Sequence, residues 1–150
     1  MQKITGHLAG YFKPFFVLLI SAFLVSCAGT GSRQFSVIQP LLDDQNSTAI
    51  AVLRDIGYQG SANLMQIGVS GVNIANLGDQ EMIAHRVEPG EQILEAKFTG
   101  FGATFAGEQS LIFEINEGEK KYFLVQMRAG AFRNTITLIE VTRAAFSSAR

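Results

Sequence analysis

The chain has 150 residues, which is enough for one ordinary domain and too few for two large ones. Apolar residues make up 47% of it and charged residues 17%, which excludes a disordered polar chain. Residues 1–26 contain no acid, and the remainder carries 10 Lys and Arg against 13 Asp and Glu, a net charge of −3. That balance gives no electrostatic reason to bind nucleic acid. One cysteine excludes an internal disulfide, and two histidines exclude most zinc sites.

The N-terminal segment has the pattern of a secretory signal peptide. Lys3, His7 and Lys13 form a weakly basic lead, and an apolar run of 11 residues follows at 15–25. A membrane-spanning helix needs about 20 apolar residues, so this run is too short to span a bilayer. A short apolar run between a basic lead and small residues predicts a signal peptide over residues 1–26.

The end of that segment, Leu24-Val25-Ser26-Cys27, resembles the bacterial lipobox. The resemblance implies cleavage before Cys27, a diacylglyceryl group on its thiol and usually an acylated amine. The alternative is a chance cysteine near the end of an ordinary signal peptide. Two or more acyl chains hold a protein stably on a membrane. We expect a lipid-anchored protein of the bacterial envelope, with this covalent lipid in place of any cofactor.

The residue after the cysteine is Ala28. In enteric-type bacteria, an aspartate at this position tends to retain a lipoprotein in the inner membrane. Because this chain has no aspartate there, it resembles lipoproteins of the outer membrane, and we expect the domain to face the periplasm. Residues 27–46 are predicted to be the lipidated cysteine and a tether, because glycines and Pro40 interrupt any periodicity and 43–46 are polar. Five apolar residues leave a second interpretation open, in which the segment packs on the domain or forms a short helix: Phe35, Val37, Ile38, Leu41 and Leu42.

From residue 47 onward, short strands alternate with turn signals at intervals of about 8–12 residues. We expect seven or eight strands, at 48–54, 64–69, 72–77, 81–87, 92–98, 111–116, 122–127 and 134–141. The first is apolar on both faces, as a central strand is. The strand at 92–98 alternates between apolar and polar residues, as a half-buried strand does.

Turn chemistry predicts how these strands connect. Strands between 48 and 87 are expected to form a tight meander, and the turn at 117–120 to join the strands on either side of it as a hairpin. Glu88-Pro89-Gly90-Glu91 is a strong turn signal. Because no long amphipathic helix lies between the strands, residues 47–150 predict an all-β antiparallel sandwich. Residues 142–150 are expected to be a short helix or a frayed tail.

Two motifs resemble a known family. Val87-Glu88-Pro89-Gly90, with the strand that follows it, resembles the V-x-P-G turn and strand of PEGA-like domains. Residues 118–123 (GEKKYF) resemble a hairpin of a related uncharacterised domain of small bacterial lipoproteins. The resemblance implies an immunoglobulin/PEGA-like β-sandwich in the envelope and carries over no activity. The chain departs from the family at Gln92, where a histidine or an aromatic residue is common.

No pattern in the sequence is typical of an enzyme. His85 is the only histidine after residue 26, and it lies in a predicted strand without the spacing of a triad to Ser70 or Ser110. Lysines stand beside the acids of the 114–119 region, so a solvated turn is expected rather than a metal site at Glu114, Glu117 and Glu119. We expect neither catalytic nor metal-binding residues.

The binding site is expected on two glycine-containing loops. Phe101 and Phe105 lie among glycines, and Arg128 and Arg133 bracket Phe132. Phenylalanine and arginine on loops are typical of contact surfaces, although the phenylalanines would equally cap the core. The sequence therefore predicts a non-enzymatic binding or assembly module for another envelope protein or a cell-wall component. The alternatives are a carrier of a small apolar ligand or lipid and, third, an envelope hydrolase using His85.

Overall fold

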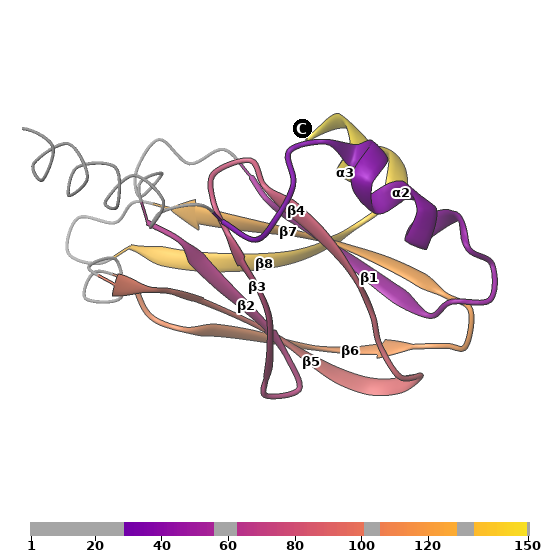
Figure 1. Ribbon diagram of the computed structural model, residues 1–150. Coiled ribbons are helices and arrows are strands. Elements are labelled where there is room, and N and C mark those ends of the chain that lie inside the picture. The colour runs from indigo at the N-terminus through magenta and orange to yellow at the C-terminus, as the bar shows by residue number, and fades with distance from the viewer. Residues whose placement is uncertain (1–28, 56–62, 101–105, 129–133, 150) are drawn as a thin grey trace, which may run out of the picture.

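The computed structural model describes residues 29–55, 63–100, 106–128 and 134–149 (Figure 1). They contain two helices and eight strands in the following order: α2 (Phe35–Asp43), β1 (Ala49–Arg54), β2 (Met65–Val69), β3 (Val72–Leu77), β4 (Met82–Arg86), β5 (Gly90–Phe98), β6 (Gln109–Ile115), β7 (Lys120–Arg128), β8 (Thr135–Val141) and α3 (Arg143–Ser148). Each predicted strand is present, within a few residues of its expected bounds.

The strands form two four-stranded sheets that pack face to face. The first sheet has the order β4-β1-β7-β8 and the second the order β3-β2-β5-β6. Helices α2 and α3 lie together on the outer side of the first sheet, so the molecule has three layers (Figure 1). The structure thus confirms the prediction of a β-sandwich with seven or eight strands.

The predicted arrangement of the strands is wrong in three places, two of which involve β1. Strands β2 and β3 form a hairpin in the second sheet, whereas β1 pairs with β4 in the first sheet, so the 48–87 region is not a meander. In addition, β1 pairs in parallel with β7, with Ala49 opposite Lys120, so the first sheet is mixed rather than antiparallel. Local patterns give the length and periodicity of a strand, while its partners depend on contacts far away in the sequence.

The turn at 117–120 does not close a hairpin. It carries the chain from β6 in the second sheet to β7 in the first. The buried rings of Phe113 and Phe123 consequently meet across the interior, with their centroids 4.9 Å apart. Gly118 adopts a φ of 76°, which suits a tight turn, and its N–H donates to the hydroxyl of Thr48. A tight turn is compatible with either connection, and burial of both phenylalanines favours the crossing between sheets.

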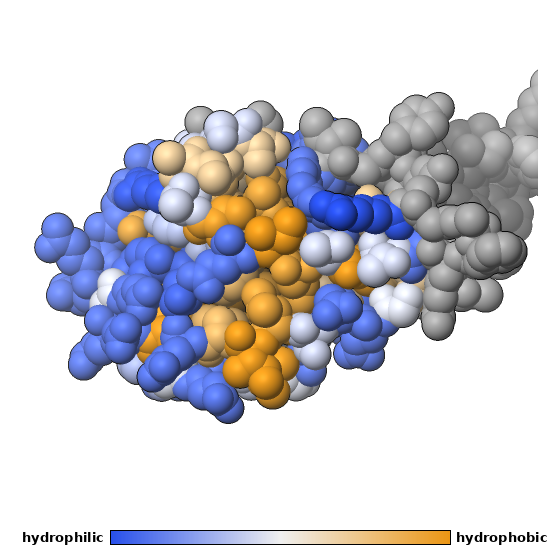
Figure 2. All heavy atoms as spheres, turned by 180° about the vertical axis from the view of Figure 1, so that it is seen from behind, coloured by the Kyte–Doolittle hydropathy of each residue, from blue (hydrophilic) through white to orange (hydrophobic). Residues whose placement is uncertain are grey.

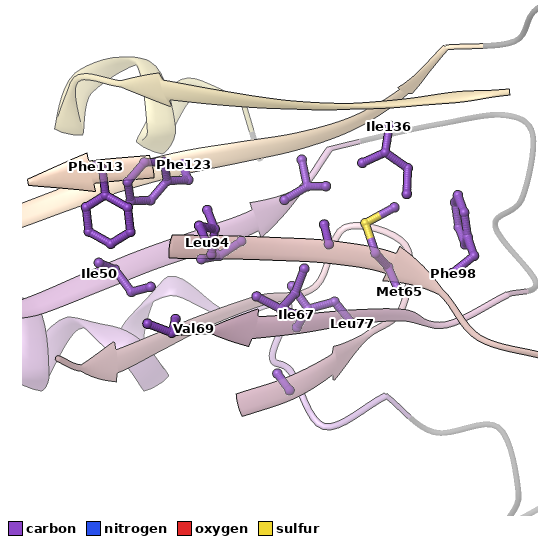
Figure 3. Close-up of a cluster of buried hydrophobic side chains, with 14 of the residues drawn as sticks. Ile50, Met65, Ile67, Val69, Leu77, Leu94, Phe98, Phe113, Phe123 and Ile136 are labelled. Atoms are coloured by element: carbon purple, nitrogen blue, oxygen red, sulfur yellow. The ribbon is translucent and has the colours of Figure 1, made fainter. Parts of the chain in front are cut away.

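The main core fills the space between the two sheets. Figure 3 shows its side chains pointing inward from both sheets, with Leu94 and Ile67 coming from the second sheet and Ile50 from the first. A second apolar cluster lies on the other side of the first sheet, beneath the helices: Ile38, Leu42, Ala51, Leu53, Met82, Tyr122, Leu124 and Phe146. The first sheet is therefore buried on both faces where the helices cover it.

Most of the segment predicted as a tether is packed on the domain. Thr30 and Ser32 bond backbone groups of β3 and β4, and Phe35–Asp43 is the helix α2, whose buried residues are Ile38 and Leu42. The interpretation left open above, a short helix on the domain, is the one that the structure has. Glycine and proline suggested a linker, but the apolar face of the helix outweighs them by covering β1 and β4.

The C-terminal segment also forms a helix. Thr142 accepts a hydrogen bond from the backbone N–H of Ala145 and so caps the start of α3. Phe146 is fully buried against Tyr122, with their ring centroids 5.5 Å apart. No helix in the described ranges is long and apolar enough to cross a membrane. The predicted signal peptide and Cys27 lie outside the described residues.

Candidate functional site

An open apolar groove of about 360 Å³ lies between α2, the strand β4 and the segment that leads into the helix. We call it the α2–β4 groove. It is lined by Thr30, Gly31, Ser32, Val37, Ile38, Leu41, Met82, Ile83 and Ala84. Val37 points away from the core, with 62% of its surface exposed. An apolar concave surface of this kind is a usual site for contact with a ligand or a partner.

The edge of a sheet forms part of this groove. β4 is the outermost strand of the first sheet, and on its outer side the backbone of Met82 exchanges two hydrogen bonds with Ser32, of 2.7 and 2.8 Å. Backbone groups in an antiparallel strand face alternate sides, so those of Ala84 and Arg86 also face outward. Within the described ranges, β4 has β1 and Ser32 as its paired backbone. Beyond Met82, no other described strand pairs with this edge.

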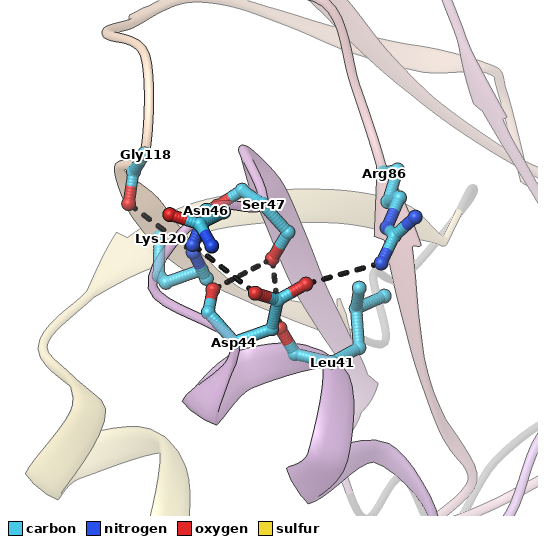
Figure 4. Close-up of polar contacts among 7 residues, drawn as sticks. All are labelled: Leu41, Asp44, Asn46, Ser47, Arg86, Gly118 and Lys120. Carbon is cyan, nitrogen blue, oxygen red and sulfur yellow. Dashed lines mark hydrogen bonds and ion pairs between the residues drawn. The ribbon is translucent and has the colours of Figure 1, made fainter.

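A polar cluster fixes the end of α2 and with it one wall of the groove (Figure 4). The hydroxyl of Ser47 donates to the carbonyl of Leu41 at 2.9 Å, and the backbone N–H of Asn46 donates to the carboxylate of Asp44 at 3.1 Å. Lys120 donates to the carbonyls of Ser47 and Gly118, which joins this loop to β7. The bond from Ser47 satisfies the carbonyl of Leu41, which belongs to the last turn of the helix and has no partner within it.

A charged pair stands where β4 ends. Arg86 Nη2 lies 3.1 Å from Asp44 Oδ2, and the side chain of Arg86 is 69% exposed. An exposed pair of this kind contributes little to stability. A guanidinium carries five N–H donors, so Arg86 can bind a carboxylate of a partner in addition to Asp44. Among the described residues, the groove therefore combines apolar walls, a strand edge without a paired strand and a cation at its end.

The residues predicted as a binding loop mostly fall outside the described ranges. Phe101, Phe105, Phe132 and Arg133 lie there, and Arg128 is an exposed residue at the end of β7. The structure therefore brings together a different set of residues, in the α2–β4 groove. The sequence held a signal for it in the apolar spacing of 35, 38 and 42, which places one face of a helix on the sheet.

The groups considered for catalysis are separated by the fold. His85 lies on β4 opposite Ile50, and burial lowers the pKa of its imidazole, which favours the neutral form. Ser110 lies on β6 in the other sheet. The hydroxyl of Ser70 donates to Gln92 at 2.8 Å, at the hairpin between β2 and β3. This arrangement offers no nucleophile beside a base among the residues described.

The acids near the 117–120 turn act within the fold. Glu119 accepts bonds from the backbone and side-chain N–H groups of Asn116, at 2.8 and 3.0 Å, and these bonds lower the pKa of its carboxyl. Lys121 lies 2.7 Å from Glu140 on β8. In the described part of the chain, no group of three or more His, Cys, Asp and Glu side chains is placed to hold a metal ion.

A second, smaller depression lies on the outer face of the second sheet. It has a volume of about 80 Å³ and its lining is polar: Gln66, Gly68, Gly71, Asn73, Glu95, Lys97 and Glu108. Gly68 leaves room there because it carries no side chain, and the carboxylate of Glu95 fills part of that space by accepting from Gly71 N–H at 3.0 Å. The larger, apolar α2–β4 groove is the stronger candidate for a binding site.

The chain matches no model of a protein family, and no curated protein sequence matches it. The resemblance to PEGA-like domains stays a prediction from two short motifs.

Proposed function

We propose that this protein is a non-enzymatic lipoprotein of the bacterial envelope whose domain binds an extended segment of another envelope protein in the α2–β4 groove. The observation that carries the proposal is the open edge of β4 beside an apolar groove. A partner strand would continue the pairing that Ser32 begins at Met82, using the backbone groups of Ala84 and Arg86. Main-chain bonds would supply affinity, and side-chain pockets would supply specificity.

The chemistry of the groove defines the partner further. An apolar side chain of the partner strand would contact Val37 and Ile83, which line the groove. A carboxylate on the same strand would reach the exposed guanidinium of Arg86. We therefore propose a partner segment that is extended, apolar at its centre and acidic at one end.

The membrane attachment belongs to the same proposal. What supports it is the sequence of residues 15–27, in which an apolar run ends at a lipobox with the only cysteine of the chain. The lipid on Cys27 would hold the domain at the outer membrane, on the periplasmic side. A PEGA-like fold type is proposed on the motifs at 87–90 and 118–123.

Site-specific photo-crosslinking in living cells tests the groove. A photoreactive amino acid is placed at Val37 in the groove and, in a matched control, at Val72 on β3, since these two valines are 62% and 64% exposed. We expect one defined protein crosslinked at position 37 and absent at position 72, with the contacted residues in an extended segment. Equal products at both positions would contradict the proposal.

A substitution in the groove tests the binding site, and the identity of the crosslinked molecule separates a protein-binding module from a carrier of a small apolar ligand or lipid. Val37→Asp places a charge in the apolar groove and should abolish the position-specific crosslink from a second probe at Ile83. The apolar lining of the same groove also favours the carrier of a small apolar ligand or lipid. Crosslinks from position 37 to lipid alone would support that carrier instead of a protein-binding module.

A further inference from the structure

Several chain segments converge at one end of the sandwich, which we call the Gly29 end. There Gly29 packs against Gly78 and Glu81, and Thr30 N–H donates to the carbonyl of Asn76 at 2.7 Å. Asn76 N–H donates in return to the Thr30 hydroxyl at 2.8 Å. The chain is thus fixed to β3 from its first described residues onward.

The strand register identifies what else lies at this end. β3 ends at Leu77, which is level with Met65 at the start of β2, and Met65 is level with Phe98 at the end of β5. β1 and β7 run parallel and end on this side at Arg54 and Arg128.

Arg54 connects the two sheets at this end. Its guanidinium is buried and donates to the carbonyls of Asn63 and Leu77, at 2.5 and 3.0 Å, while lying 5.4 Å from the centre of the Phe98 ring. One side chain of β1 therefore contacts the end of β3 and the end of β5 in the other sheet.

The connection to the predicted lipid is short. Cys27 stands two residues before Gly29, and each residue extends a chain by at most about 3.6 Å, so their Cα atoms lie within about 7 Å of each other. A tether ending at residue 46 would have allowed roughly 25 Å. From the reach of this connection we propose that the Gly29 end of the domain rests on the surface of the bilayer, with the opposite end pointing away. This inference rests on the lipid anchor of the proposed function.

The distribution of charge supports this orientation independently. At the opposite end, acids outnumber bases by eight to four: Asp43, Asp44, Glu88, Glu91, Glu114, Glu117, Glu119 and Glu140 against Arg86, Lys120, Lys121 and Arg143. At the Gly29 end the described acids and bases are nearly equal in number, at five to four: Asp55, Asp79, Glu81, Glu95 and Glu108 against Arg33, Arg54, Lys97 and Arg128. Figure 2 shows hydrophilic side chains covering the end away from the grey residues. A bilayer containing anionic lipids repels the acidic end and leaves the nearly balanced end free to approach.

The orientation limits where a partner can bind. The longest strands have nine residues and rise about 3.3 Å per residue, so the domain extends roughly 30 Å from the bilayer. A partner segment must come to the membrane surface to reach β4, because the short connection to the lipid keeps the domain from moving away from the bilayer.

Spin labels on the lipidated full-length chain test the orientation. Cys27 is the only cysteine and its thiol is blocked by the lipid, so Glu108→Cys and Glu117→Cys each introduce one free thiol. Both glutamates are exposed, the first toward the Gly29 end and the second at the opposite end. The labelled proteins are reconstituted in liposomes of phosphatidylethanolamine and phosphatidylglycerol that contain a nickel-chelating lipid. We expect strong paramagnetic relaxation at position 108 and little at position 117.

Two controls separate the orientation from the anchor. Inserting 20 Gly and Ser residues between Ala28 and Gly29 should abolish the difference between the two labels, because the domain then moves on a flexible linker. Equal relaxation at both positions without the insertion, or stronger relaxation at 117, would overturn the orientation and leave the anchor intact. Cys27→Ser should prevent flotation of the protein with the liposomes. Flotation unaffected by that change would overturn the anchor and the orientation with it.

Discussion

The two sheets of the sandwich differ in what covers their outer faces. In the first sheet, all six residues of β1 are buried, because the main core lies on one side of it and α2 on the other. In the second sheet, β5 alternates between buried and more exposed residues, and its Ile93 stands beside Ile112 of β6 on an uncovered face. The strand that is apolar on both faces thus lies in a middle layer, and the alternating strand lies in an outer layer.

This difference shows what a strand that is apolar on both faces requires. A two-layer sandwich buries only one face of each sheet. The apolar run at 48–54 therefore implies a third layer, as well as a central position in its sheet. The third layer is α2, which comes immediately before β1 in the chain, and α3, which comes immediately after β8.

The largest effect is expected in the core between the two sheets. Phe123→Ala removes a fully buried ring that packs on Phe113 and should lower the free energy of unfolding by about 3–5 kcal/mol. Equilibrium unfolding in urea measures this loss in the free energy of unfolding. Ile112→Ala is the control on the uncovered face, where the side chain is 63% exposed, and a change below about 0.5 kcal/mol is expected. Similar losses for both variants would contradict the assignment of the faces.

A smaller effect is expected beneath the helices. Phe146→Ala also removes a fully buried ring, but α3 is a short terminal helix that can detach without unfolding the sheets. We expect a loss of about 2–3 kcal/mol, below the full value for a buried phenylalanine. Hydrogen exchange should accelerate in α2 and α3 and stay unchanged in β2 and β5. Faster exchange throughout both sheets would show that the third layer is part of the main folding unit.

The smallest effect concerns the turn that joins the two sheets. Hydrogen bonds from Asn116 lower the pKa of Glu119 in the folded protein. A carboxyl whose pKa is lower in the folded than in the unfolded protein stabilises the fold at a pH above its unfolded pKa. This contribution to stability is lost as the pH falls through the folded pKa. Glu119→Gln should therefore flatten the acid side of the stability curve slightly. Urea midpoints between about pH 7 and pH 3 measure it, and an unchanged acid limb in the variant would contradict the prediction.

The sequence predicted the elements of the fold better than their arrangement. Alternation within 92–98 and the both-face burial at 48–54 depend on neighbouring residues, so those strands were predictable. Parallel pairing of Ala49 with Lys120 depends on residues far apart in the chain, and no local pattern encodes it. The turn signal at 117–120 is compatible both with a hairpin and with a crossing between the two sheets, so it does not distinguish these connections.

The candidate groove was predictable only in part. The apolar residues of 35–42 suggested a helix, yet Pro40 lies inside α2 and argued for a linker. The helix persists because Ile38 and Leu42 are buried on the sheet, and tertiary packing of this kind outweighs a weak local propensity. The open edge of β4 could not be predicted without the strand order, because an edge is a property of the assembled sheet.

The parallel pairing of β1 and β7 has a consequence for how the chain folds. β1 is the first of the described strands in chain order, and its parallel partner β7 follows only after β2–β6. Contacts between distant parts of a chain form slowly because a long loop must close first. We expect the edge of β1 that pairs with β7 to stay unpaired until the chain has extended through β7. A chain truncated before β7 would keep this edge of β1 unpaired.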